Sequence, residues 1–180
     1  MPAEYVPYLI IALVAAVLIA VTVVLARLTW RRQVRRYVVA LVGRREAILA
    51  ALKAIDGVLA TLAGGTVEDV IAFARPESEE RRVIAEIAAR MRIQTGELTD
   101  LPLPKKLWPL ADLLDVAAQA LASSAAAVGE AEDDAVLDAL SALDLTASRT
   151  ALDDAEAEIA RLAEIYDLTD PSVYGGGLYI

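Results

Sequence analysis

The sequence contains neither cysteine nor histidine, and these two absences remove whole classes of chemistry. Without cysteine there is no disulfide framework and no thiolate ligand for a metal. Without histidine the chain lacks the usual general base, the usual zinc ligand and the Glu-x-x-His pairs that hold di-iron centres in helical bundles. We therefore expect neither a metal nor any other cofactor.

Aromatic residues are scarce at 5% of the chain, although 57% of the residues are hydrophobic. Sheets favour aromatic and β-branched residues in alternation, so an apolar set dominated by Ala, Leu, Val and Ile favours helix. The 7 prolines and 9 glycines cluster at a few points, as breaks between long helices. We predict an all-α fold in which a single N-terminal transmembrane helix continues into an antiparallel helical bundle of about four helices with coiled-coil-like packing.

The formal net charge of -9 is divided unequally along the chain. Residues 1–106 hold 15 basic and 11 acidic side chains, a balance of +4, whereas residues 107–180 hold 2 basic and 15 acidic side chains, a balance of -13. An acidic distal half argues against binding of nucleic acid, whose phosphates it would repel. It either attracts a basic partner or only keeps an apolar domain in solution.

The apolar run over residues 5–26 is uncharged for 22 residues. At about 1.5 Å per residue, a helix of this length crosses the roughly 30 Å hydrocarbon core of a bilayer. Tyr5, Tyr8 and Trp30 stand where interfacial aromatic residues are expected. The end of the run resembles a signal-peptide cleavage site, but a secretory signal begins with positive charge and has a shorter apolar core. We therefore expect a retained membrane anchor.

No Lys or Arg precedes the apolar run, and five arginines follow it: Arg27, Arg31, Arg32, Arg35 and Arg36. The positive-inside rule predicts a single-pass protein of the cell membrane, with its N-terminus outside and its C-terminal domain in the cytoplasm. The same arginines could bind anionic lipid head groups, each contributing about 1 kcal/mol near a charged surface. The alternative is that they only set the orientation.

A row of small residues, Ala12, Ala16 and Ala20, recurs every four residues within the apolar run. Such a row lets two helices approach closely in lipid. It is a candidate contact for self-association, which would make the protein a homo-oligomer, or for docking onto another transmembrane helix. An alanine-rich span also produces this spacing by chance.

After the arginines, apolar residues recur at alternating spacings of four and three, with Arg45 as the one interruption: Val34, Val38, Leu41, Ile48, Leu52, Ile55, Leu59 and Leu62. This heptad seam predicts coiled-coil or bundle packing. Gly43 and Gly57 each cost the helix about 1 kcal/mol relative to Ala, so packing must hold it. We expect the transmembrane helix to continue to Gly64-Gly65.

Two shorter helices are predicted next. Thr66 and Asp69 form a capping-box pattern that begins a helix ending before Arg75-Pro76. A second helix is predicted over residues 77–95, closed by Gly96.

The proline-containing segment 96–104 is predicted to be a linker. A long helix is then expected over residues 105–129. The acidic turn 130–134 opens a final helical stretch, with a kink or break near Asp144 where the apolar row slips. An extended rod made by several copies is the alternative to a bundle.

The C-terminal tail ends in three glycines followed by Leu178, Tyr179 and Ile180. Apolar residues on a flexible hinge could be captured by a partner groove as an added strand. Alternatively, the tail packs back onto the helices or stays disordered.

The sequence contains no recognisable catalytic motif. A glycine-rich phosphate loop is lacking, and the acidic turn 130–134 does not have the spacing of an EF-hand. Carboxylate pairs such as Asp112 with Asp115, or Asp153 with Asp154, fall on predicted polar helix faces with nothing obvious to raise a pKa. We expect them to be surface charges, and we expect the protein not to be an enzyme.

These predictions divide the chain into an anchor (1–29), a basic juxtamembrane segment (30–36), a cytoplasmic helical bundle (37–167) and a tail (168–180). The preferred function is a non-enzymatic, membrane-anchored scaffold or adaptor that presents a partner-binding surface at the cytoplasmic face. The alternative is an accessory subunit that docks onto a larger membrane complex through its transmembrane helix.

The predicted layout of outside N-terminus, single span and cytoplasmic helices resembles bacterial division regulators of the spectrin-like kind and the peripheral-stalk subunit of ATP synthases, in layout only. The 14 arginines against 3 lysines, with abundant alanine, suggest a GC-rich bacterial genome.

Overall fold

The computed structural model describes residues 6–166 of the chain, with side chains from residue 13 onward. Every regular element in this range is a helix, which confirms the predicted all-α class for the described residues. The chain divides into two compact units, Met1–Tyr37 and Val38–Ile180. One helix, α1 (Val6–Gly64), belongs to both, because it contains the boundary between them.

In the first unit, every described side chain from Leu13 to Gln33 is exposed. The helix persists here despite the β-branched valines, because each backbone amide is bonded within the helix itself. Among residues 13–33 no apolar side chain is buried.

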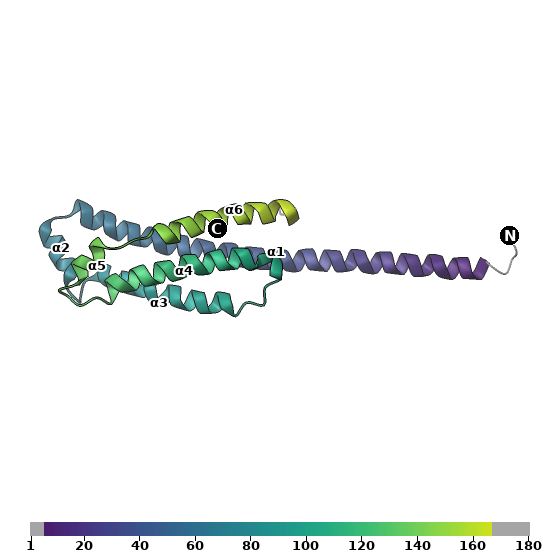
Figure 1. Ribbon diagram of the computed structural model, residues 1–180, viewed down its shortest axis with the longest axis horizontal. Coiled ribbons are helices and arrows are strands. Elements are labelled where there is room, and N and C mark those ends of the chain that lie inside the picture. The colour runs from purple at the N-terminus through teal and green to yellow at the C-terminus, as the bar shows by residue number, and fades with distance from the viewer. Residues whose placement is uncertain (1–5, 167–180) are drawn as a thin grey trace. The chain divides into compact units, whose positions relative to one another are not determined.

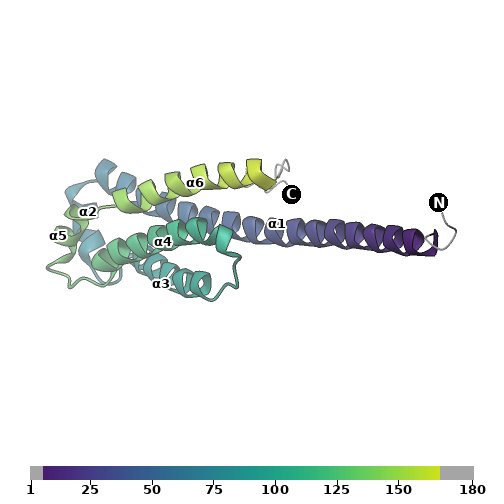
Figure 2. The same ribbon diagram turned by 45° about the vertical axis from the view of Figure 1, so that its right-hand side comes forward.

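The second unit contains the remainder of α1 and all later helices (Figure 1). These are α2 (Val67–Ala74), α3 (Glu79–Thr99), the 3-10 turn η2 (Lys105–Leu107), α4 (Trp108–Gly129), α5 (Val136–Ser141) and α6 (Thr146–Tyr166). Helix α4 lies between α3 and α6 and packs against both (Figures 1 and 2). Its small and medium apolar side chains allow this close approach on two sides.

The core of this unit is built from the apolar stripes that the sequence shows. Within the seam of α1, the side chains of Val38, Leu41, Ile48, Leu52 and Ile55 are buried. Helix α4 contributes Leu110, Leu114, Ala117, Leu121, Ala125 and Val128, and α6 contributes Leu152, Ala155, Ile159 and Leu162. Burying each Leu, Ile or Val side chain of this core stabilises it by about 1.5–3 kcal/mol relative to water, which offsets the cost of the glycines in α1.

The predicted capping box of α2 is confirmed. The Thr66 amide donates to Oδ2 of Asp69 at 2.7 Å, and the Asp69 amide donates to Oγ1 of Thr66 at 3.3 Å. The Thr66 amide and the Thr66 hydroxyl both donate to Oδ2 of Asp69, and they lower the pKa of this carboxyl because they favour its charged form. The helix ends at Ala74, directly before Arg75, as predicted.

The prediction that Gly96 closes α3 is wrong, because α3 continues to Thr99. Leu98 is only 4% exposed, so the last turn is held by burial, and Gly96 lies at an open position inside the helix. The irregular linker is correspondingly shorter and contains Leu101 to Pro104.

The predicted break near Asp144 is confirmed. Helix α5 ends at Ser141 and α6 begins at Thr146. Between them, Oδ1 of Asp144 accepts a hydrogen bond of 2.8 Å from the Thr146 amide. The Thr146 side chain and this amide lower the pKa of Asp144. Asp144 thus satisfies the first backbone amide of α6 and favours the break.

Candidate functional site

The first candidate site is the exposed apolar part of α1, which is long and apolar enough to cross a membrane. Leu13 is 67% exposed and Ile19 is 65% exposed, so these side chains have no partner within the described first unit. The stretch Lys105–Gly129 is also long and apolar enough to cross a membrane, by length and composition alone. There, however, Leu110, Leu114 and Leu121 are fully buried, which is typical of a core helix.

Thr22 lies within this stretch and Thr29 lies just after it, and the hydroxyls of both donate to backbone carbonyls of α1. Thr22 donates to the carbonyl of Leu18 at 2.8 Å, and Thr29 donates to the carbonyl of Leu25 at 3.0 Å. A polar group that is bonded back to its own helix loses little on leaving water. The threonines are therefore compatible with a membrane environment.

The five arginines (27, 31, 32, 35 and 36) lie directly after this stretch, and all are exposed on α1. At about 100° per residue, their positions cover roughly half of the helix circumference. No Asp or Glu occurs between residues 5 and 45 of the sequence. The first unit thus has a strongly cationic band next to its apolar stretch, which is the charge pattern that anionic head groups attract.

The small-residue row is only partly described. Ala16 and Ala20 are exposed, and their four-residue spacing places them on one face of α1. Ala12 lies within α1, but its side chain is outside the described set. The tail residues Leu178, Tyr179 and Ile180 also lie outside the described residues.

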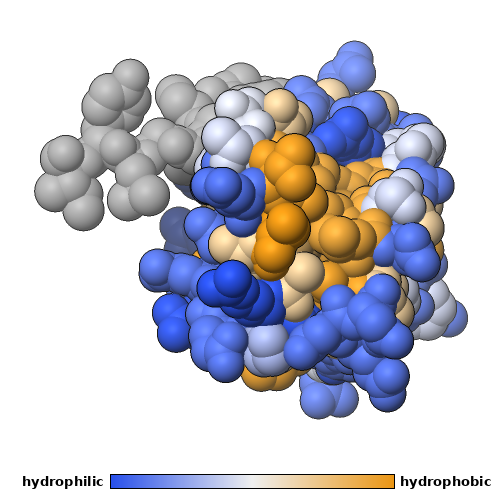
Figure 3. All heavy atoms as spheres, turned by 90° about the vertical axis from the view of Figure 1, so that its left-hand side faces the viewer, coloured by the Kyte–Doolittle hydropathy of each residue, from blue (hydrophilic) through white to orange (hydrophobic). Residues whose placement is uncertain are grey.

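An exposed apolar surface lies at the end of the second unit formed by α2 and α5. Figure 3 shows apolar side chains at the centre of this end, with a hydrophilic rim. The most exposed large apolar residues of these two helices are Val67 at 76%, Ile71 at 51% and Leu137 at 40%. The opposite face of α2 is also apolar, since Phe73 is buried in the core.

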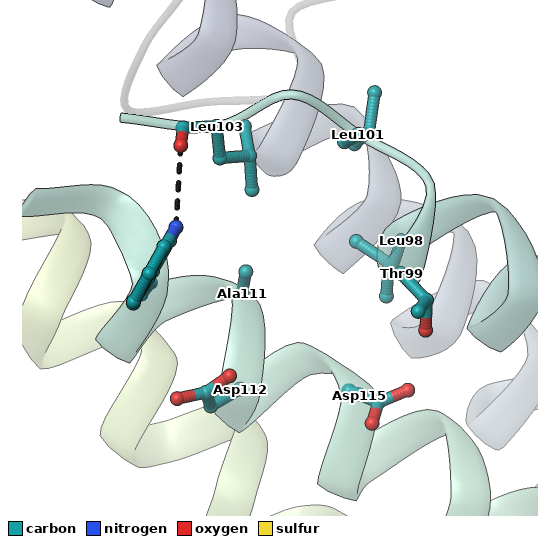
Figure 4. Close-up of a pocket in the computed structure, with 8 residues that line it drawn as sticks. Leu98, Thr99, Leu101, Leu103, Ala111, Asp112 and Asp115 are labelled. Atoms are coloured by element: carbon teal, nitrogen blue, oxygen red, sulfur yellow. Dashed lines mark hydrogen bonds between the residues drawn. The ribbon is translucent and has the colours of Figure 1, made fainter. Parts of the chain in front are cut away.

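A cavity of about 250 Å³ lies between the end of α3, the linker and the start of α4. Its walls are mostly apolar, and two carboxylates stand on one side (Figure 4). The lining residues are Leu98, Thr99, Leu101, Leu103, Trp108, Ala111, Asp112 and Asp115. The ring nitrogen of Trp108 donates to the Leu103 carbonyl at 3.2 Å, and this bond ties the linker to α4.

Asp115 is the titratable group in this cavity whose environment differs most from water. Burial raises the pKa of its carboxyl, the neighbouring Asp112 carboxylate raises it further, and the side chains of Gln119 and Thr95 partly offset the rise. The expectation that Asp115 is an ordinary surface charge was therefore wrong. The sequence shows that Asp112 and Asp115 share a helix face, but not that the linker and α3 fold over it.

The acidic turn 130–134 forms ion pairs with α3. Arg92 contacts Oε1 of Glu130 at 2.6 Å, which lowers the pKa of Glu130. Arg81, only 7% exposed, donates to Oδ1 of Asp133 at 2.8 Å and also to the carbonyls of Ala74 and Ala131. The burial of Arg81 was not predicted, because nothing in the sequence distinguishes it from the exposed Arg82.

Among the residues that the structure describes, no group of three or more Asp, Glu, His or Cys side chains is placed to hold a metal ion. Comparison with protein families, curated proteins and solved structures finds no match to this chain. Three candidate surfaces are therefore present in the described residues: the apolar stretch of α1, the apolar end formed by α2 and α5, and the cavity beside Trp108.

Proposed function

We propose that this protein is a non-enzymatic, membrane-anchored helical scaffold or adaptor, which presents a partner-binding surface at the cytoplasmic face of the cell membrane. The observation that carries the proposal is the change of environment along α1. Its apolar side chains are exposed from Leu13 to Leu28, whereas those of its second part, such as Leu41 and Ile48, are buried. An exposed apolar stretch of this length is stable only in lipid or under a partner.

The orientation follows from the arginine band. With the arginines on the cytoplasmic side, the N-terminus lies outside and the second unit lies inside. Arg27, Arg31, Arg32, Arg35 and Arg36 then reach the level of the anionic lipid head groups.

Within the second unit we propose an antiparallel bundle of α1, α3, α4 and α6. Gly129, at the end of α4, lies against Ala85, near the start of α3, which supports opposite directions for these two helices. Ion pairs support the remaining neighbours, since α1 is bonded to α3 through Arg44 and Glu97 and to α6 through Asp56 and Arg149.

The partner-binding surface is proposed to be the apolar end formed by α2 and α5, together with the tail residues Leu178, Tyr179 and Ile180. Val67 and Ile71 support this, because a helix with apolar residues on both faces is normally covered. The net negative charge of residues 107–180 favours a basic partner.

A second candidate is an accessory subunit that docks onto a larger membrane complex through its transmembrane helix, or onto a second copy. The exposed row of Ala16 and Ala20, extended by Ala12 in the sequence, favours it.

The membrane topology is tested by cysteine labelling. The native chain lacks cysteine, so any label on the purified protein reports the introduced residue. Ala3→Cys and Thr150→Cys variants are expressed separately in intact bacterial cells and treated with a membrane-impermeant maleimide. We expect labelling at position 3 in intact cells and at position 150 only after lysis. The reverse pattern, or a mature product that begins near Arg27, would overturn the proposal.

The two functions are distinguished by replacing residues 5–26 with an unrelated apolar span in the full-length chain. For a scaffold, detergent purification of the native and chimeric chains recovers the same partner. For an accessory subunit, the chimera inserts into the membrane but loses the partner.

A further inference from the structure

The cavity beside Trp108 is the strongest unassigned site in the described chain. It is formed by three elements that are close only after folding: the last turn of α3, the linker and the first turns of α4. Leu101 and Leu103 lie across the opening from Asp112 and Asp115 (Figure 4). The site therefore combines apolar walls with negative charge at one side.

The charge of this cavity is uncompensated by its own lining. Within the described part of the chain, Asp112 and Asp115 are the two ionisable lining residues, and no Lys or Arg lines the cavity. Gln119 donates to Oδ2 of Asp115 at 2.8 Å, whereas Oδ1 is buried without a hydrogen bond of normal geometry among the described residues. Two carboxylates with no cation beside them in the cavity wall are the groups that guanidinium or ammonium N–H donors satisfy.

Trp108 adds a surface that favours cations. Its indole N–H is held by the Leu103 carbonyl, so the ring has a fixed orientation at the wall of the cavity. The ammonium group of Lys105, which does not line the cavity, lies 5.9 Å from the ring centroid, within the range of a cation–π contact. The ring thus already takes part in a contact of this kind.

The size of the cavity limits what it can hold. Its volume of about 250 Å³ is below the roughly 300–1,000 Å³ that is usual for cofactors and drug-sized ligands. A single small group fits better than a nucleotide or a haem.

We propose that this cavity binds one organic cation, a guanidinium or ammonium group on a short apolar stem, with its charged head at Asp112 and Asp115 and its stem against Trp108. The inference does not depend on the membrane anchor or on the scaffold function. The cation is supplied either by a free small amine or by a basic side chain of another protein, and the two sources share this chemistry.

The test uses the full-length chain with Trp30→Phe, purified in a nonionic detergent. Because the chain has 2 tryptophans, this change leaves Trp108 as the only one. Its fluorescence is followed during titration with n-butylguanidinium at constant ionic strength. The neutral control ligand is n-butylurea, which has nearly the same shape. Asp112→Asn and Asp115→Asn are compared with Asp153→Asn, which removes the same charge from an exposed position on α6.

We expect the Trp108 fluorescence to change in a saturable way with n-butylguanidinium and not to change with n-butylurea. Asp112→Asn and Asp115→Asn should each weaken binding about fivefold or more, which corresponds to about 1 kcal/mol, whereas Asp153→Asn leaves binding within about twofold. The proposal is overturned if the response does not saturate, if n-butylurea acts equally, or if all three variants behave alike. Helical circular dichroism shows which variants are folded, and the exposed Asp112 position carries the test if Asp115→Asn unfolds.

A second titration distinguishes the two sources. The peptide acetyl-Ala-Arg-Ala-amide presents the same guanidinium group on a polypeptide backbone. Binding at least as tight as that of n-butylguanidinium supports a side chain of another protein. Exclusion of the peptide, with n-butylguanidinium still bound, supports a free small amine.

Discussion

The side-chain amide of Gln94 donates a hydrogen bond of 2.9 Å to the main-chain carbonyl of Arg44. Gln94 is 4% exposed, so this polar group lies within the core between α3 and α1. A buried amide is stable only where a partner is in place, and therefore this bond favours one register of α3 against α1.

Gln94→Ala should lower the free energy of unfolding of the second unit by about 1–3 kcal/mol, because it removes a buried hydrogen bond and the packed stem of the side chain. Urea unfolding of the full chain, followed by Trp108 fluorescence in the Trp30→Phe background, measures the change. Arg90→Ala, at an exposed position on the same helix, is the control and should change stability by less than about 0.5 kcal/mol. Equal effects of the two substitutions would contradict a structural role for Gln94.

Two glycines should respond to alanine with opposite signs. A Cβ at Gly129 would lie 2.7 Å from Cα of Ala85, a backbone atom that can move only with its helix. Gly129→Ala should therefore destabilise the second unit by about 1–3 kcal/mol. Gly96, inside α3, has open space around it, and Gly96→Ala should stabilise the unit by about 0.5–1 kcal/mol. Thermal unfolding followed by circular dichroism reports both signs, and a stabilising Gly129→Ala would show that α3 and α4 are not in close contact.

Arg81 and Arg82 are adjacent in the sequence but should differ strongly in importance. Arg81→Met removes the donors for Asp133 and for the carbonyls of Ala74 and Ala131, and should cost about 2–4 kcal/mol. Arg82 is 66% exposed and its ion-pair distances are 3.7 Å, so Arg82→Met should cost less than about 0.5 kcal/mol. Denaturant midpoints of the two variants measure the difference, and similar midpoints would refute the buried network.

Asp115 should make the stability of the second unit depend on pH. Burial and the Asp112 carboxylate raise the pKa of Asp115 above its value in the unfolded chain. The folded state then binds the proton more tightly, so stability increases as the pH falls through that raised pKa and is lower at neutral pH, where the group is ionised. Asp115→Asn should accordingly raise the melting temperature at pH 7 and remove this pH dependence.

The control for Asp115 is Asp153→Asn, at an exposed position of α6. It should leave both the melting temperature at pH 7 and its pH dependence almost unchanged. If Asp115→Asn lowers the melting temperature at pH 7, the ionised carboxylate stabilises the fold, which would contradict a pKa raised by burial.

Local rules predicted much of this structure. The capping box of Thr66 and Asp69 and the end of α4 at Gly129 depend on neighbouring residues alone, and both were found as expected. The end of α3 was misplaced because Gly96 is a poor helix former locally, whereas the burial of Leu98 extends the helix past it. Local propensity is a weak term and packing overrides it.

The sequence alone determined the helical class, the exposed apolar stretch and the arginine band, because composition and periodicity act within a few turns of one helix. Only the tertiary structure decided that Arg81 is buried while Arg82 is not, and that Asp115 joins Trp108 and Leu103 in one cavity. These relationships join segments from different helices and the linker. Their distances depend on how whole helices pack, which no local pattern of residues encodes.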